Sequence, residues 1–256
     1  MSHHKIEARG LKYAYPDGHE AVKDISFVIH HGEAVGVIGA NGAGKSTLLM
    51  LLMGVLFPDG GDVLVGDVLV TKKTLSMIRK SLGMVFQDPN DQLFMTTVYD
   101  DVAFGPRNYK VDEAEVDRRV KEALELVGIA HLSDRAPFKL SGGEKRAASI
   151  ATVLSMQPDL LILDEPTAAL DPKSRRRIMK LLKGFSHTKI ITSHDLDMVY
   201  ELCDRIIVLK NGVVVADGKT SEILTDAALL DACGLELPLA MQGCPVCGGN
   251  QETRHK

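Results

Sequence analysis

The pattern of hydrophobic and polar positions changes its period along the chain and predicts an α/β protein. Mostly period-2 alternation runs through Ala21–Ile29, and further short strands are predicted at Ala34–Ile38, Leu160–Leu163 and Lys189–Thr192. A helix is predicted over Pro172–Phe185. Strands that alternate with helices in this way favour an α/β core.

Turn residues add two predicted hairpins to this core. Each pairs a glycine with a residue that tolerates a tight turn, between two runs of strand-forming residues. The turns are Gly66-Asp67, within residues 62–70, and Asn211-Gly212, within residues 205–217. The first hairpin and the N-terminal extended segments predict an antiparallel β subdomain beside the core.

The middle of the chain is helical rather than alternating. Four apolar residues fall on one face of a predicted helix there, and two acids stand at its start in capping positions. The apolar residues are Val116, Val120, Leu124 and Val127, and the acids are Asp112 and Glu115. We therefore expect a core from residues 1–87 and 156–217, an inserted helical subdomain over 88–155, and a C-terminal extension over 218–256.

Composition excludes several classes of protein. The 256 residues include 30 Lys and Arg against 34 Asp and Glu, a net charge of −4 that argues against binding nucleic acid through net charge. The most apolar run, Ser46–Phe57, is 12 residues long, whereas a spanning helix needs about 20. Four cysteines suggest a reducing compartment. We expect a cytosolic protein that reaches a membrane only by docking onto a membrane partner.

A glycine-rich loop carries the first chemistry. It fits GxxxxGK[ST], between an apolar strand and an apolar helix, and consists of Gly39, Ala40, Asn41, Gly42, Ala43, Gly44, Lys45 and Ser46. Its backbone N–H groups and the following helix N-terminus suit phosphate oxygens. We expect Lys45 to reach the β- and γ-phosphates, Ser46 to bind Mg²⁺, and Thr47 to join the nucleotide site. This motif alone also fits a GTPase, a small-molecule kinase or a DNA-repair ATPase.

Two carboxylates end the apolar strand Leu160–Leu163. Parallel strands present their ends at the edge where the glycine loop also lies. We expect Asp164 to hold Mg²⁺, directly or through water, and Glu165 to act as general base on the attacking water.

A second anion-binding helix start follows Leu140. Ser141 is placed to cap a helix, and Gly142 and Gly143 allow a phosphate to approach closely. A single triphosphate in one glycine loop does not need this element. We therefore expect it to serve a neighbouring copy.

Taken together, the order of these motifs resembles the nucleotide-binding subunit of an ATP-binding-cassette (ABC) transporter, over about residues 5–220. The resemblance implies a P-loop (RecA-like) ATPase, one ABC domain over about 5–240, and a head-to-tail dimer that sandwiches ATP. It also implies roles for further residues. Tyr15 (alternatively Tyr13) would stack on adenine, Gln87 would touch Mg²⁺ and the lytic water, Asp171 would cross to the partner, and His194 would contact the γ-phosphate. Glu144 departs from the family's usual Gln.

The segment after Gln87 resembles energy-coupling-factor ATPases. It mixes acids with apolar residues, a composition that suits an incoming helix bearing Arg. The expected groove consists of Asp88, Asp91, Leu93 and Phe94. The resemblance implies a transmembrane scaffold subunit and a substrate-binding membrane subunit as partners, at the cytoplasmic face of the membrane, with cobalt or nickel ions as cargo. An ABC ATPase of another transporter, for a vitamin or another small molecule, is the alternative.

The sequence lacks the features that other classes of nucleotide-binding protein would show. The sequence contains no guanine-reading Asn-Lys-x-Asp, no sustained heptads between the glycine loop and Leu140, and a single cassette. Cys244 and Cys247 form half of a zinc-ribbon pattern, which is more typical here of an exposed tail with incidental thiols. Cargo and the choice between a homodimer and a heterodimer stay open.

Overall fold

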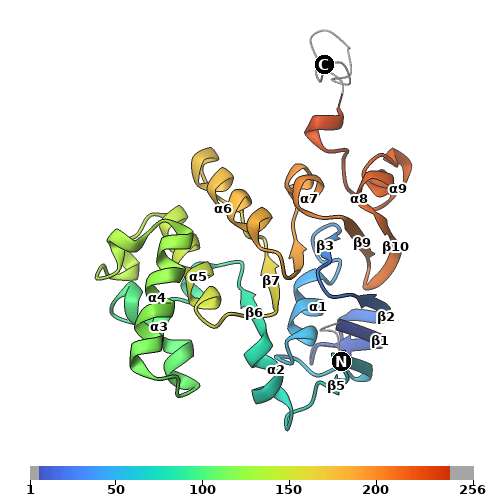
Figure 1. Ribbon diagram of the computed structural model, residues 1–256. Coiled ribbons are helices and arrows are strands. Elements are labelled where there is room, and N and C mark those ends of the chain that lie inside the picture. Colours follow the sequence, from blue (N-terminus) through green and yellow to red (C-terminus); the bar gives the residue numbers. More distant parts are fainter. Residues whose placement is uncertain (1–5, 243–256) are drawn as a thin grey trace.

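The computed structural model describes residues 6–242, and within them ten strands form one sheet in the order β5-β4-β1-β2-β10-β9-β3-β8-β7-β6 (Figure 1). Cys244 and Cys247 lie outside the described residues. The strands are β1 (Ile6–Ala14), β2 (Glu20–Ile29), β3 (Ala34–Ile38), β4 (Gly60–Val65), β5 (Val68–Leu69), β6 (Leu82–Val85), β7 (Leu160–Asp164), β8 (Thr188–Thr192), β9 (Arg205–Lys210) and β10 (Val213–Lys219).

The core of the sheet is parallel. Strands β9, β3, β8, β7 and β6 pair in parallel with one another, and every residue of β3, β6, β7 and β8 is buried. Burial on both faces explains why these strands read as continuous apolar runs. Parallel pairing places the ends of β3, β7 and β8 at one edge, which confirms the predicted α/β core.

The other end of the sheet is antiparallel. Strand β1 pairs with β2 and β4, and β4 turns into β5 at the predicted Gly66-Asp67 hairpin. The second predicted hairpin joins β9 to β10, where Asn211 and Gly212 both have positive φ, at 50° and 80°. Both hairpins and the antiparallel subdomain are therefore confirmed.

Nine α-helices surround the sheet in the described chain, and α3, α4 and α5 gather on the side away from β1 and β2 (Figure 1). They are α1 (Lys45–Leu52), α2 (Leu75–Ser81), α3 (Val98–Asn108), α4 (Glu113–Val127), α5 (Gly142–Leu154), α6 (Pro172–Gly184), α7 (Leu196–Leu202), α8 (Thr220–Ile223) and α9 (Ala227–Ala232). Short 3-10 turns lie at Pro89–Asp91, Ala130–Leu132, Pro137–Lys139 and Leu239–Met241.

The predicted face of α4 is buried as expected, with Val116, Val120, Leu124 and Val127 all in the core. Asp112 caps the helix by accepting a hydrogen bond from the Ala114 N–H. The prediction is wrong for Glu115, whose carboxylate instead pairs with Arg118 and Arg119, one turn further along.

Two apolar clusters divide the interior. One packs α1 between the parallel strands and the antiparallel β subdomain; the other joins the sheet to the helices α3–α7. The second cluster includes Ile223, Leu224 and Leu230 from the segment after β10. The first helices of the expected C-terminal extension thus pack against the core.

Candidate functional site

The glycine loop leaves β3 and enters α1 through backbone positions that only glycine suits. Gly44 has φ 101°, and a Cβ there would lie 2.5 Å from the Ala21 carbonyl oxygen. A Cβ on Gly39 would lie 2.3 Å from the Leu209 carbonyl oxygen. The loop is therefore tightly seated on β2 and β9, with its amides at the start of α1.

Lys45 lies almost buried in the curl of this loop. Its Nζ donates hydrogen bonds to the carbonyl oxygens of Gly39 (2.8 Å) and Ala40 (3.1 Å), and it lies 3.2 Å from Nε2 of His194. Burial lowers the pKa of the Lys45 ammonium, while the charges of Glu165 and Asp164 oppose that shift. The Lys45 ammonium thus lies at the same edge of the sheet as the carboxylates of Asp164 and Glu165.

The two acids at the end of β7 have different surroundings. The hydroxyl of Thr192 donates to Asp164 Oδ1, which fixes that carboxylate between β7 and β8. Glu165 has left-handed backbone, with φ 47°, and its N–H donates to the Thr192 carbonyl at 3.1 Å. This turn directs the Glu165 side chain toward His194 instead of along the strand.

The Glu165 carboxylate is buried, and only one of its two oxygens accepts hydrogen bonds from the part of the chain that the structure describes. Oε2 accepts from the Ser193 hydroxyl (3.2 Å) and the His194 N–H (3.3 Å). Among the described residues Oε1 has no hydrogen-bond partner, and it lies 3.7 Å from His194 Nε2. Burial raises the pKa of Glu165. A buried carboxylate oxygen with raised basicity suits the abstraction of a proton from water.

These groups line one cleft of about 250 Å³, together with Tyr15. The Tyr15 hydroxyl shares a 3.0 Å hydrogen bond with Thr47 Oγ1, and its ring lies edge-on to Tyr13 at 5.1 Å between centroids. Tyr13 packs against the core behind it. The lining consists of Tyr15, His19, Ala21, Asn41, Gly42, Ala43, Gly44, Lys45, Ser46, Thr47, Gln87, Asp164, Glu165 and His194.

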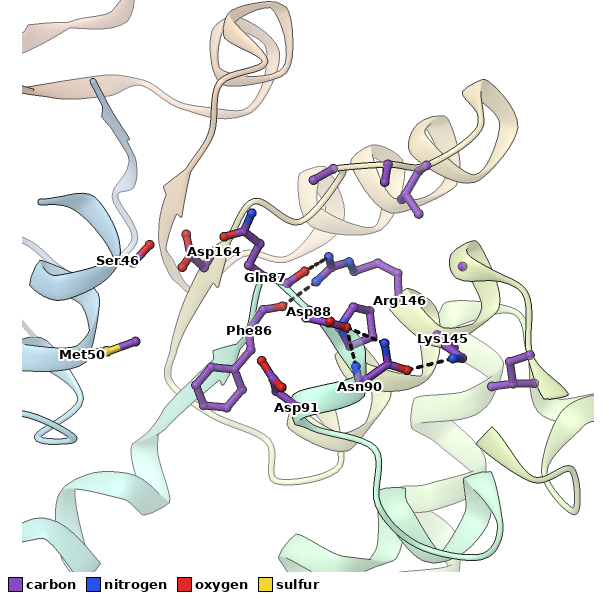
Figure 2. Close-up of a pocket in the computed structure, with 16 residues that line it drawn as sticks. Ser46, Met50, Phe86, Gln87, Asp88, Asn90, Asp91, Lys145, Arg146 and Asp164 are labelled. Carbon is purple, nitrogen blue, oxygen red and sulfur yellow. Dashed lines mark hydrogen bonds between the residues drawn. The ribbon is translucent and has the colours of Figure 1, made fainter. Parts of the chain in front are cut away.

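A larger cleft of about 640 Å³ begins on the other side of Gln87 and extends to α5 (Figure 2). Ser46, Gln87 and Asp164 line both clefts. The larger one is completed by Met50, Phe86, Asp88, Pro89, Asn90, Asp91, Leu140, Gly142, Lys145, Arg146, Ala168, Ala169 and Leu170.

Most of the residues expected to act in a neighbouring copy stand apart from the phosphate loop; Gly142 is the exception, because it lines the larger cleft together with Ser46. Ser141 caps α5, and Glu144 completes a capping box by accepting from the Ser141 N–H at 2.7 Å. Asp171 caps α6 through the N–H groups of Lys173 and Ser174. Ser141, Gly143 and Asp171 line a separate hollow of about 230 Å³. Neither that hollow nor the 250 Å³ cleft contains both sets of residues.

The expected partner groove is divided by the fold. Asp88 and Asp91 line the larger cleft, and the Phe94 side chain is exposed beside Phe104, 4.9 Å away between ring centroids. The prediction is wrong for Leu93, which is buried in the core and does not line the larger cleft. Leu93 stands between the half-buried Gln92 and the exposed Phe94.

Comparison with known proteins decides the family. The pattern of the ABC transporter family matches residues 22–168. This chain belongs to that family. It is an ATPase coupled to transport, with the ABC ATPase fold.

Relatives of this ABC ATPase cover nearly its whole length. A Geobacter sulfurreducens protein, GSU1281, named as an ABC transporter ATP-binding protein, is 63% identical over 97% of this chain and 100% of its own. The energy-coupling factor transporter ATP-binding protein EcfA of Methanothermobacter thermautotrophicus is 45% identical over 91% of this chain and 76% of its own.

Solved structures agree with the fold. The cbiO1 protein of Clostridium perfringens, part of the ABC transporter complex cbiONQ, has a TM-score of 0.79 and 41% identity, covering 90% of this chain and 94% of its own. The dimeric cassette MJ0796 bound to ADP and Pi has a TM-score of 0.77 and 28% identity, covering 84% and 98%. In residues 6–242 of the ABC ATPase, no helix is long and apolar enough to cross a membrane.

Two residues that hold the wall of the larger cleft in place were not predicted from the sequence; of the two, only Arg146 lines the cleft itself. Arg146 and Gln92 both hold the segment after β6 against α5. One signal was available for Arg146: it occupies the same helical stripe as Ile150 and Val153, so a cation stands on an otherwise apolar, buried face. Gln92 carries no such mark.

Proposed function

We propose that this ABC ATPase energises a membrane importer of the energy-coupling-factor type. The proposal is supported by the 45% identity to an EcfA protein and by the similarity to cbiO1, a part of the cbiONQ complex. The subunit would dock peripherally, at the cytoplasmic face, on a transmembrane scaffold subunit that also carries a substrate-binding membrane subunit.

The residues that line the 250 Å³ cleft would bind the phosphates and Mg²⁺ in separate roles. Lys45 and the loop amides would bind the β- and γ-phosphates, and His194 would contact the γ-phosphate. Ser46, Asp164 and Gln87 offer a hydroxyl, a carboxylate and an amide around one space, an oxygen donor set that fits Mg²⁺. When bound, Mg²⁺ would neutralise charge on the phosphates.

Glu165 would then take the proton from the attacking water. Its free Oε1, its burial and its raised pKa all favour that role. The hydrogen bonds from Ser193 and His194 to Oε2 would hold the carboxylate in place while Oε1 accepts the proton.

Dimerisation would complete the site. The signature residues Ser141, Gly142 and Gly143, together with Asp171, would reach the nucleotide of a second ATPase subunit. The dimeric state of MJ0796 supports this arrangement. The second subunit would be either an identical copy or a close relative, because both would present the same motifs.

The observation that carries the proposed docking is the larger cleft itself. It places the acidic turn after β6 beside Gln87, Ser46 and Asp164. A helix bearing Arg and seated there would touch the same segment that supplies Gln87. Asp88 already accepts two hydrogen bonds from Asn90, so Asp91 is the acid with more capacity for the incoming Arg.

For the cargo we propose cobalt or nickel ions. This choice is supported by overall similarity to the ATPases of cobalt and nickel importers. It is not supported by a residue of this chain that would touch the ion. A vitamin or another small molecule is the alternative, and it would leave the docking surface and the ATPase site unchanged.

The test is a double substitution, Asp91→Ala with Phe94→Ala, in the complex with its membrane subunits. Removing one partner of a desolvated charge pair costs about 2–5 kcal/mol of binding. We therefore expect lost co-purification and lost uptake of Co²⁺ or Ni²⁺, with ATP binding by the isolated chain unchanged.

Glu201→Ala with Tyr200→Ala provides a matched control, because it also removes an exposed acid and an exposed aromatic ring, from α7. The control should assemble normally. Full co-purification and normal uptake with the Asp91 and Phe94 variant would refute the docking surface. Uptake of a vitamin by the wild-type complex would refute only the metal cargo.

A further inference from the structure

Arg146 is a buried cation outside the phosphate cleft. It belongs to α5, where it is only 2% exposed, and burial lowers the pKa of its guanidinium. The negative charges of Asp88, Asp164 and Glu165 act in the opposite direction. A buried arginine is costly unless its donors are used, so its partners indicate why it is there.

Those partners are two successive backbone carbonyls. Nη1 donates to the Phe86 oxygen at 2.6 Å, and Nη2 donates to the Gln87 oxygen (Figure 2). The planar guanidinium suits such a two-pronged contact, whereas a lysine presents a single point charge. In Figure 2 the Gln87 side chain extends from this clamped backbone to the side of the cleft that holds Asp164 and Ser46.

The same segment is braced to α5 at two further points. Gln92 accepts from the Phe86 N–H (3.2 Å) and donates to the Ser149 carbonyl (2.8 Å). Lys145 donates to Asn90 Oδ1 at 2.8 Å. The residues from Phe86 to Gln92 are therefore fixed to α5, and β6 connects them to the core sheet.

From this geometry we infer that Arg146 is a positioning residue for hydrolysis, which makes the placement of Gln87 depend on the position of α5. The inference rests on the proposed role of Gln87 at Mg²⁺ and the lytic water. Ser141 is the N-cap of α5, so the residue that positions Gln87 in its own cleft and the cap proposed to reach a second subunit's nucleotide belong to one helical element. A shift of α5 then moves both together.

The inference is tested by a double-mutant cycle on ATP hydrolysis by the full-length chain, with Arg146→Ala and Gln87→Ala. Misplacement of a reacting group by about 1 Å can cost about 100-fold in rate. We expect Arg146→Ala to lower kcat by about that factor while the ATP dissociation constant changes by less than about threefold. In the Gln87→Ala background the same substitution should change kcat by less than about threefold, because residues that act through each other are not additive.

Arg146→Lys covers the case in which the alanine variant does not fold. It keeps the charge but loses the planar, two-pronged geometry of the guanidinium, so we expect an intermediate loss of kcat with a Tm near that of the wild type. Arg118→Ala is the matched control, since Arg118 is an exposed arginine of the same subdomain, and it should leave kcat unchanged.

The outcomes separate the two claims. Wild-type kcat in Arg146→Lys, or fully additive losses in the double variant, would overturn the inference and leave the role of Gln87 intact. Wild-type kcat in Gln87→Ala would overturn the proposed role of Gln87 and, with it, the inference.

Discussion

The two clefts that meet at Gln87 are built in different ways. The 250 Å³ cleft is made mostly from one continuous loop and from the ends of adjacent parallel strands. The 640 Å³ cleft is held by side chains that reach across about 60 positions of sequence, such as Arg146 to Phe86. The positions of the residues in the smaller cleft are therefore determined by the backbone of the loop and the strand ends, whereas the connection of the larger cleft to α5 depends on a few tertiary hydrogen bonds.

The largest effect should come from the cleft of local origin. Glu165→Gln keeps the shape of the side chain and removes the base, so we expect kcat to fall by about 10²–10⁴-fold. ATP binding should survive and trap a stable dimer, measurable by size-exclusion chromatography. Lys45→Ala should weaken ATP binding itself. Wild-type hydrolysis by Glu165→Gln would show that this cleft has another base.

The pH dependence sharpens the same test. Because burial raises the pKa of Glu165, the acidic loss of kcat/KM should occur above 4.5, the ordinary value for Glu. The pH dependence of folding stability should have the opposite sign. As pH rises from 4.5 through the raised pKa, the unfolded chain ionises Glu165 more readily than the folded chain does, so the wild type loses stability relative to Glu165→Gln. A Tm difference between the two that does not change with pH would contradict this.

The sequence predicted the first cleft well for the same physical reason. The glycine loop and the Asp164-Glu165 pair are contiguous motifs, and parallel pairing of β3, β7 and β8 follows from their buried apolar runs. It did not predict the bracing by Arg146 and Gln92, because those contacts exist only after α5 packs against the segment. Leu93 was misplaced because a mixed acidic and apolar run does not reveal which side of a short turn faces the core.

Two neighbouring residues of the segment after Gln87, one buried and one exposed, should differ in how much their truncation lowers the free energy of unfolding. Leu93→Ala removes a buried side chain and should cost about 2–5 kcal/mol of unfolding free energy in urea titrations. Phe94→Ala loses mainly its edge-on contact with Phe104, worth about 0.5–1.5 kcal/mol. Equal losses would mean that Phe94 belongs to the fold and is not available to a partner.

The smallest expected effect concerns adenine, at the outer end of the first cleft. Stacking on an aromatic ring is worth about 1–3 kcal/mol per base in nucleic-acid complexes. Tyr15→Ala should therefore raise the ATP dissociation constant by about 5- to 150-fold, measured by nucleotide titration. The choice of Tyr15 over Tyr13 is supported by position, because Tyr15 lines the cleft and Tyr13 packs behind it.

A conservative substitution at the same position separates the effect of the Tyr15 ring from that of its hydroxyl. Tyr15→Phe keeps the stacking ring but removes the hydrogen bond to Thr47, a residue of the phosphate-binding helix. A net hydrogen bond is worth about 0.5–1.5 kcal/mol, so the loss of affinity should stay at or below about tenfold and below that of Tyr15→Ala. If Tyr13→Ala weakens ATP binding more than Tyr15→Ala does, adenine stacks on the other ring and the cleft extends further toward β1 than its present lining indicates.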